Sequence, residues 1–238
     1  MDHYARARLK EMTPIPTKYL FIKAIGGLLY VSIAVFALVF LPAWTFNYWE
    51  AWVFLAVFTV SISAIFIYLA RNDPSLLARR VKTTEKARNQ NIIRFLLNLA
   101  FTAVFVVSAL DHRFAWSAVP LKIVFFGDVL VALGLLLIFF VFKENTFTAQ
   151  TVEVETEQRV ISTGPYAIVR HPMYVGGLVF IAGIPLALSS WWGLLMAALF
   201  APVIAWRILD EERLLTMDLM GYAEYREKVK FRLIPFVW

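Results

Sequence analysis

Long apolar runs separated by shorter polar segments dominate the pattern of this chain. A helix needs about 20 mostly apolar residues to cross the roughly 30 Å hydrocarbon core of a bilayer. A short fifth run is joined to the sixth through Ser189-Ser190. The pattern predicts an all-α integral membrane protein with about six transmembrane helices, the last two forming a tight hairpin. The six runs are Leu20–Phe40, Trp49–Ala70, Ile92–Leu110, Pro120–Phe142, Met173–Leu188 and Trp191–Ile208.

Composition points to the same class of protein. Hydrophobic residues make up 61% of the 238 residues and charged residues 17%, whereas a soluble domain carries about a quarter charged residues. The chain has no cysteine, which excludes disulfides and thiol nucleophiles. Its three histidines, His3, His112 and His171, are too scattered to form a metal site, so we expect no metal.

Lysine and arginine gather in alternate polar segments: the head before Leu20, 71–91, 143–172, and the tail from Arg207. Such residues mark the cytoplasmic side of a membrane protein. We therefore expect both termini on the cytoplasmic side of a bacterial inner membrane or the endoplasmic reticulum. The same rule explains the net charge of +6, so the expected partners are membrane lipids and no nucleic acid. The oligomeric state is left open.

The chain divides into two expected parts. Residues 1–142 have the pattern of a four-span membrane scaffold, and 143–238 carry the motifs with chemistry. The exception in the first part is Asp128, inside the fourth run. An ionisable group at that depth indicates either a functional site or a bond to a neighbouring helix.

The first motif runs from Gly164 to Gly176, with the sequence GPYAIVRHPMYVG. Pro172 suits the first turn of a helix. Arg170 and His171 would then lie at a helix start, where unpaired N–H groups attract anions. Tyr174 would share a helix face with His171.

The second motif follows the last apolar run. Arg207 and Glu211 are four residues apart on one helix face, and Glu212 is the next residue. A cluster of interfacial salt bridges is the alternative interpretation of this segment. Further on, Tyr222, Tyr225 and Val229 predict a cytoplasmic C-terminal amphipathic helix, which lies on the membrane surface or folds under the bundle as a lid.

Together these segments predict a pocket for a nucleotide-like cofactor that opens to lipid. No G-x-G occurs in the chain, so a Rossmann site is unsupported.

At these residues the chain resembles the isoprenylcysteine carboxyl methyltransferase family and the related integral-membrane phospholipid methyltransferases. The shared pattern is G-P-Y-x3-R-H-P-x-Y-x-G, a helical hairpin, R-x3-E-E-x2-L, Y-x2-Y and a late proline, here Pro235. The resemblance covers about 143–238 and implies a C-terminal methyltransferase module that binds S-adenosyl-L-methionine. Arg207 takes the position associated with the acceptor. The implied cofactor-binding residues are Gln158, Arg159, Val160, Ile161, Tyr166, His171, Pro172, Met173, Tyr174, Glu211 and, as the second acid, Glu212.

The resulting hypothesis is an S-adenosyl-L-methionine-dependent methyltransferase for a lipophilic acceptor, most like protein-S-isoprenylcysteine O-methyltransferase. A carboxylate acceptor is ionised at neutral pH and needs no general base, and Arg207 would hold it by a charge-assisted bond. One alternative is an NADPH-dependent sterol or steroid reductase. Such enzymes resemble this module but typically have asparagine where this chain has Met173. Another alternative is a non-enzymatic scaffold or transporter, although no inverted repeat is visible.

Overall fold

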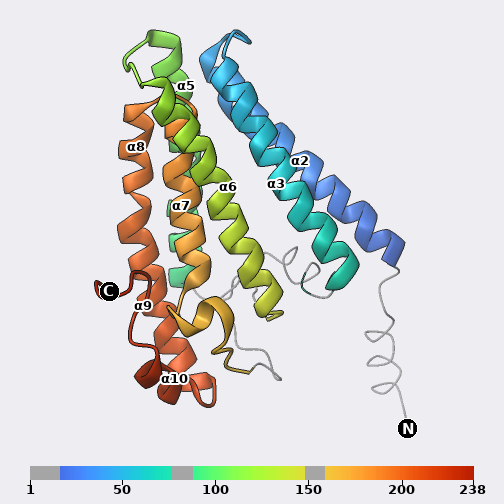
Figure 1. Cartoon of the computed structure of the whole chain (residues 1–238), viewed down its shortest axis with the longest axis vertical. Helices are drawn as coiled ribbons and strands as arrows, with labels where there is room; N and C mark the ends of the chain where they lie inside the picture. Colours follow the sequence, from blue (N-terminus) through green and yellow to red (C-terminus); the bar gives the residue numbers. More distant parts are fainter. Residues whose placement is uncertain (1–16, 75, 77–87, 148–158) are drawn as a thin grey trace.

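The structure is a computed structural model that describes residues 17–74, 76, 88–147 and 159–238 (Figure 1). Within these ranges every regular element is a helix. Figure 1 shows the long helices running along one common direction, with α2 and α3 inclined away from the others at one end. The helices are α2 (Thr17–Ala43), α3 (Trp49–Asn72), α5 (Arg88–Phe114), α6 (Leu121–Glu144), η1 (Gly164–Ala167), α7 (Pro172–Ala187), α8 (Trp191–Ala198), α9 (Phe200–Asp218) and α10 (Tyr222–Lys228).

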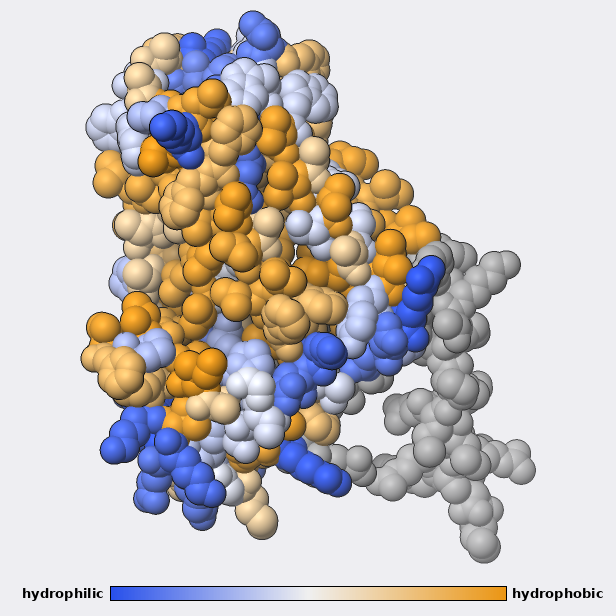
Figure 2. All heavy atoms as spheres, in the orientation of Figure 1, coloured by the Kyte–Doolittle hydropathy of each residue, from blue (hydrophilic) through white to orange (hydrophobic). Residues whose placement is uncertain are grey.

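Among the described residues, five helical stretches are long and apolar enough to cross a membrane. They are Ile25–Ala43, Trp49–Asn72, Asn89–Phe114, Leu121–Glu144 and Trp191–Asp218. The remaining apolar helix, α7, has only 16 residues. Five of the six predicted spans therefore correspond to helical stretches of membrane-spanning length. The other predicted span, at α7, corresponds to a shorter helix. On the visible face, hydrophobic side chains cover the middle and hydrophilic ones gather toward the two ends (Figure 2).

The last stretch is interrupted between α8 and α9, at Leu199. Pro202 lies four residues after Ala198. Proline has no N–H to donate to the carbonyl four residues earlier, and its ring crowds that carbonyl. The two helices nevertheless follow one another along one side of the molecule (Figure 1). The sequence prediction treated this stretch as one helix and did not include the break.

Helix α7 packs against α6 through glycines in both helices. A Cβ atom added to Gly134 would lie 2.5 Å from the backbone nitrogen of Phe180 and 2.7 Å from the carbonyl oxygen of Gly176. One added to Gly183 would lie 2.8 Å from the carbonyl oxygen of Gly127. Such small residues allow two helix backbones to approach closely. The contact fixes the beginning of α7, where the first motif lies, relative to α6.

At the opposite end of the bundle, polar contacts hold the turn between α7 and α8. The hydroxyl of Ser190 donates to Oδ2 of Asp111 at 2.5 Å, and that of Ser117 donates to the same oxygen at 2.6 Å. Tyr48 donates from its hydroxyl to the carbonyl oxygen of Leu188 at 2.6 Å. Buried polar groups of this kind are stable because each has a partner. These bonds anchor α7 and α8 to α5 and to the start of α3.

Asp128 faces the inside of the bundle from α6 and is 6% exposed. Neither of its carboxylate oxygens has a hydrogen-bond partner among the residues that the structure describes. Asp128 therefore points inward, as predicted. The predicted hydrogen bond to a neighbouring helix is not found among the described residues.

Candidate functional site

Both motifs and the end of the chain meet at one end of the bundle, where η1, the start of α7, the end of α9 and α10 gather (Figure 1). The backbone N–H of Arg170 donates to the carbonyl oxygen of Phe231 at 2.9 Å. The backbone N–H of His171 donates to the carbonyl oxygen of Arg232 at 3.0 Å. The residues after α10 therefore return to the first motif and pair with it directly.

Glu212 is the centre of this region. It is 4% exposed, and its Oε1 accepts from Nε of Arg170 at 2.7 Å and contacts Nε2 of His171 at 3.1 Å. Its other oxygen, Oε2, accepts from Nε of Arg232 at 2.9 Å. A buried carboxylate is tolerated when it is paired in this way. Glu212 thus joins the first motif, α9 and the C-terminal segment through partners that lie outside the second motif.

Arg170 extends this connection to the tail. Its Nη1 donates to the carbonyl oxygen of Val229 at 2.8 Å and to that of Lys230 at 2.9 Å. The start of α7 was predicted to attract an anion, and the carboxylate of Glu212 is the negative group that lies there. The guanidinium of Arg170 consequently orders the chain beyond α10.

A second chain of hydrogen bonds includes the other acid of the pair. Nε of Arg207 donates to the hydroxyl oxygen of Tyr174 at 2.9 Å, and that hydroxyl donates to Oε2 of Glu211 at 2.6 Å. The four-residue spacing of Arg207 and Glu211 places both on the face of α9 that meets α7. Arg207 is buried, whereas Glu211 is partly exposed. The predicted grouping of these three residues is present in the structure.

Tyr166, in η1, lies on the other side of the region. Its hydroxyl oxygen accepts from Nδ2 of Asn145 at 3.0 Å, and its carbonyl oxygen accepts from the hydroxyl of Tyr225 at 2.8 Å. Just before it, Gly164 has a left-handed φ of +56°, and an added Cβ would lie 2.9 Å from Cδ of Glu144. Both the backbone conformation and the close carboxylate favour glycine at this position. The end of α6 and α10 therefore hold η1 between them.

The remaining predicted cofactor residues occupy different environments. Pro172 is buried at the first position of α7, and Met173 is partly buried. Val160 packs against a cluster of buried residues, Leu219, Tyr222, Tyr225 and Val229, which we call the tail cluster. Arg159 is exposed, Ile161 is partly buried, and neither belongs to a strand. Gln158 lies outside the described residues.

Two residues of the site were not among the predicted ones. Arg170 belongs to the first motif, so its place beside His171 was the available signal. Arg232 carries no such signal, because it lies 20 residues from Glu212 in sequence and outside any helix. Neither local spacing nor periodicity points to it.

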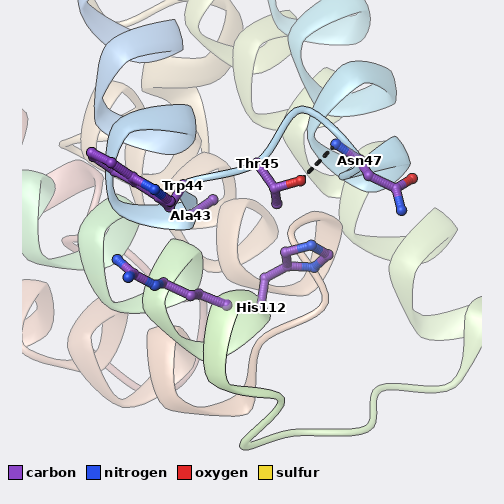
Figure 3. A pocket seen from close by; sticks show the side chains of 6 residues that line it. Ala43, Trp44, Thr45, Asn47 and His112 are labelled. Atoms are coloured by element: carbon purple, nitrogen blue, oxygen red, sulfur yellow. Dashed lines mark hydrogen bonds between the residues drawn. The ribbon is translucent and has the colours of Figure 1, made fainter.

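A separate hollow of about 380 Å³ lies at the opposite end of the bundle, lined by Ala43, Trp44, Thr45, Asn47, His112 and Arg113 (Figure 3). In Figure 3 the ring of His112 and the side chains of Thr45 and Asn47 approach it from two sides. The ring of His112 stacks on Tyr48, with ring centroids 3.6 Å apart. This hollow is distinct from the region around Glu211 and Glu212.

Comparison with known proteins agrees with the geometry. Residues 123–221 match the model of the family described as phospholipid methyltransferase, which includes membrane methyltransferases of the isoprenylcysteine type. The resemblance expected from the motifs is confirmed over these residues. A search of curated proteins found no match to the chain. Residues 123–221 are therefore similar to a phospholipid methyltransferase module, and they lie within a bundle of helices long and apolar enough to cross a membrane.

The matched range begins inside α6 and ends at Gly221, just before α10. It therefore includes a helix that the predicted division at residue 142 assigns to the scaffold. The packing of α6 against α7 through glycines agrees with this extent. The division itself stays a prediction.

Proposed function

We propose that this protein is an S-adenosyl-L-methionine-dependent methyltransferase that acts on a lipophilic acceptor, most like the carboxyl O-methylation of a prenylcysteine. The observation that carries the proposal is the junction of the two motifs at Tyr174, Glu211 and Glu212. Hydrogen bonds there join Arg170, just before α7, and Tyr174 of α7 to residues of α9 that are more than thirty positions away. The family match over 123–221 supports methyl transfer.

The residues at this junction fit the cofactor chemically. S-adenosyl-L-methionine carries a positive sulfonium and an ammonium group, which favour a nearby carboxylate. Glu211 is partly exposed and accepts from Tyr174, whereas both oxygens of Glu212 already have protein partners. The hydroxyl of Tyr222 is buried without a partner among the described residues. We therefore assign cofactor binding chiefly to Glu211, with Tyr166, His171, Met173 and Tyr174 around it.

The bound cofactor supplies a methyl group that is already electrophilic. The protein must place the acceptor beside that group and exclude water. Arg207 lies next to Tyr174 and offers a guanidinium that can hold an acceptor carboxylate. A carboxylate is ionised at neutral pH, so no residue has to remove a proton. This agrees with a site in which His171 is bonded to Glu212.

In the proposed arrangement, the lipid tail of the acceptor enters between the membrane-spanning helices. The cofactor enters from the cytoplasm, beneath α10. The helices that form 1–142 would then act as the scaffold that shapes this entrance, and 143–238 would supply the chemistry.

The experiment that tests the acceptor uses S-adenosyl-L-methionine with a tritiated methyl group. The purified protein is incubated with total lipid and membrane-protein extract, and labelled species are separated and treated with alkali. A carboxyl methyl ester releases volatile tritiated methanol, which is the expected result. An N-methylated phospholipid keeps its label, and that result would overturn carboxyl methylation while leaving methyl transfer intact. A parallel reaction with NADPH and a sterol panel, followed by absorbance, tests the reductase alternative.

A further inference from the structure

The side chain of Tyr222 has an unusual position for a tyrosine. It is the first residue of α10, directly after Gly221, whose φ is 84°. The side chain is 4% exposed, and its hydroxyl makes no hydrogen bond with any residue that the structure describes. A buried hydroxyl without a partner destabilises a folded protein, because it has lost its bonds to water. Such groups are rare and call for a physical reason.

Packing alone does not supply that reason. The ring of Tyr222 lies in the tail cluster with Tyr225, at a centroid distance of 5.8 Å. Phenylalanine would fill the same space without an unpaired oxygen. Tyr225 differs in this respect, because its hydroxyl donates to the carbonyl oxygen of Tyr166. The two tyrosines share a helix and a cluster, yet only one of them uses its hydroxyl within the described fold.

The surroundings of Tyr222 are those of the proposed cofactor site. Burial is the main factor that raises the pKa of Tyr222 above its ordinary value, and the charges of Glu212 and Glu211 raise it further. The guanidinium of Arg170 acts in the opposite direction. The hydroxyl therefore lies within electrostatic reach of both acids of the second motif. It remains a neutral hydrogen-bonding group at any physiological pH.

We propose that the hydroxyl of Tyr222 is a hydrogen-bonding contact of the nucleoside cofactor, which it binds together with Glu211. This inference rests on the proposed function, since it assumes that the cofactor occupies the junction of the two motifs. The hydroxyl has no partner among the residues that the structure describes, and in this proposal the cofactor supplies one. The stability lost in the ligand-free protein is then recovered as affinity on binding.

The substitution Tyr222→Phe removes one oxygen and tests this directly. Isothermal titration calorimetry with S-adenosylhomocysteine is expected to give a Kd about 3- to 10-fold higher for the variant, the effect of one hydrogen bond. Without ligand, the variant should unfold at the same or a higher temperature than the wild type, because it has lost an unpaired buried group. A purely structural role of the Tyr222 hydroxyl would not give weaker cofactor binding together with undiminished stability.

Tyr225→Phe is the matched comparison, since it removes the same atom from the same helix. Its hydroxyl has a partner in the fold, so this variant should lower the unfolding temperature without ligand. Equal affinity of Tyr222→Phe and the wild type would overturn the inference alone, as would a lower unfolding temperature of Tyr222→Phe. Absence of any binding by the wild type would instead overturn the proposed function, and the inference with it.

Discussion

Two adjacent carboxylates, at 211 and 212, have different surroundings because consecutive helical residues point roughly 100° apart. Glu212 points into the protein and pairs with Arg170, His171 and Arg232. Glu211 points toward Tyr174 and remains partly exposed. The geometry thus separates a structural acid from one that a ligand can reach.

Glu212→Gln is expected to destabilise the protein strongly. The glutamine side chain keeps the shape but removes the charge that compensates two arginines, one of them buried. Breaking a buried ion pair costs about 3–5 kcal/mol. Thermal unfolding of the purified protein in detergent would detect this as a marked fall in Tm. A variant with the wild-type Tm would contradict the central role of Glu212.

Glu211→Gln should behave in the opposite way. The side chain is partly exposed and accepts a hydrogen bond from the hydroxyl of Tyr174, which a glutamine oxygen can still accept. We expect a Tm within a few degrees of the wild type and at least a tenfold loss of affinity for S-adenosylhomocysteine, equivalent to about 1.4 kcal/mol. Calorimetry on both acid variants, prepared in parallel, gives the comparison. Unchanged affinity of Glu211→Gln would refute the assignment of this acid to the cofactor.

The sequence allowed part of this site to be predicted. Arg207, Glu211 and Tyr174 follow from a four-residue helical spacing and from the motif, and the structure brings them together. The partners of Glu212 were harder to predict from the sequence. Arg232 approaches it from a segment without regular structure, and the path of such a segment depends on tertiary contacts that no periodicity encodes.

At the scale of whole helices, the position of the first motif depends on the contact between α6 and α7. Gly127 and Gly134 on α6 are seven residues apart, as are Gly176 and Gly183 on α7. Seven residues are close to two helical turns, so each pair lies on one face. The common spacing is visible in the sequence, but only the structure shows that the two faces meet.

Gly134→Ala is expected to separate these helices and destabilise the protein. Its Cβ would lie 2.5 Å from a backbone nitrogen of α7, which cannot move aside as a flexible side chain can. Overpacking of this kind costs about 1–3 kcal/mol. Gly177→Ala is the matched control, because an added Cβ there meets nothing within 4 Å and alanine favours the helix by roughly 0.5–1 kcal/mol. Thermal unfolding should rank Gly177→Ala at or above the wild type, and Gly134→Ala below both. The reverse order would show that α6 and α7 are not held together at these glycines.

The helices themselves were the most predictable feature. The apolar runs at 49–70, 92–110 and 120–142 lie within α3, α5 and α6 apart from one residue at the start of α6, because an apolar run of that length has few alternatives to a helix in lipid. The break at Leu199 was missed although Pro202 was its signal. A proline near a helix end is tolerated in membrane helices often enough that hydropathy alone does not reveal a break.

For the whole molecule, the arrangement of the two ends makes the orientation in the membrane testable. Both motifs, α10 and the tail gather at one end, and the loop between α5 and α6 lies at the other (Figure 1). Lysine and arginine are frequent in the tail from Arg207, which lies at the first end, so we expect that end to face the cytoplasm. The proposed entry of the cofactor from the cytoplasm would need the same orientation.

The absence of cysteine from the chain allows a direct test of this orientation. Ala223→Cys places a thiol on the exposed side of α10, and Ala118→Cys places one in the exposed loop before α6. Both replace a small exposed side chain, so neither should alter folding, and the unmodified protein serves as the background without a thiol. With the variants expressed in bacteria, a maleimide that cannot cross the inner membrane should label Ala118→Cys in intact cells and leave Ala223→Cys unlabelled until that membrane is opened. The two positions lie at opposite ends of α6. The opposite labelling pattern would therefore show that the protein has the opposite orientation in the membrane. It would place the proposed cofactor site on the side of the membrane where no cytoplasmic nucleoside can reach it.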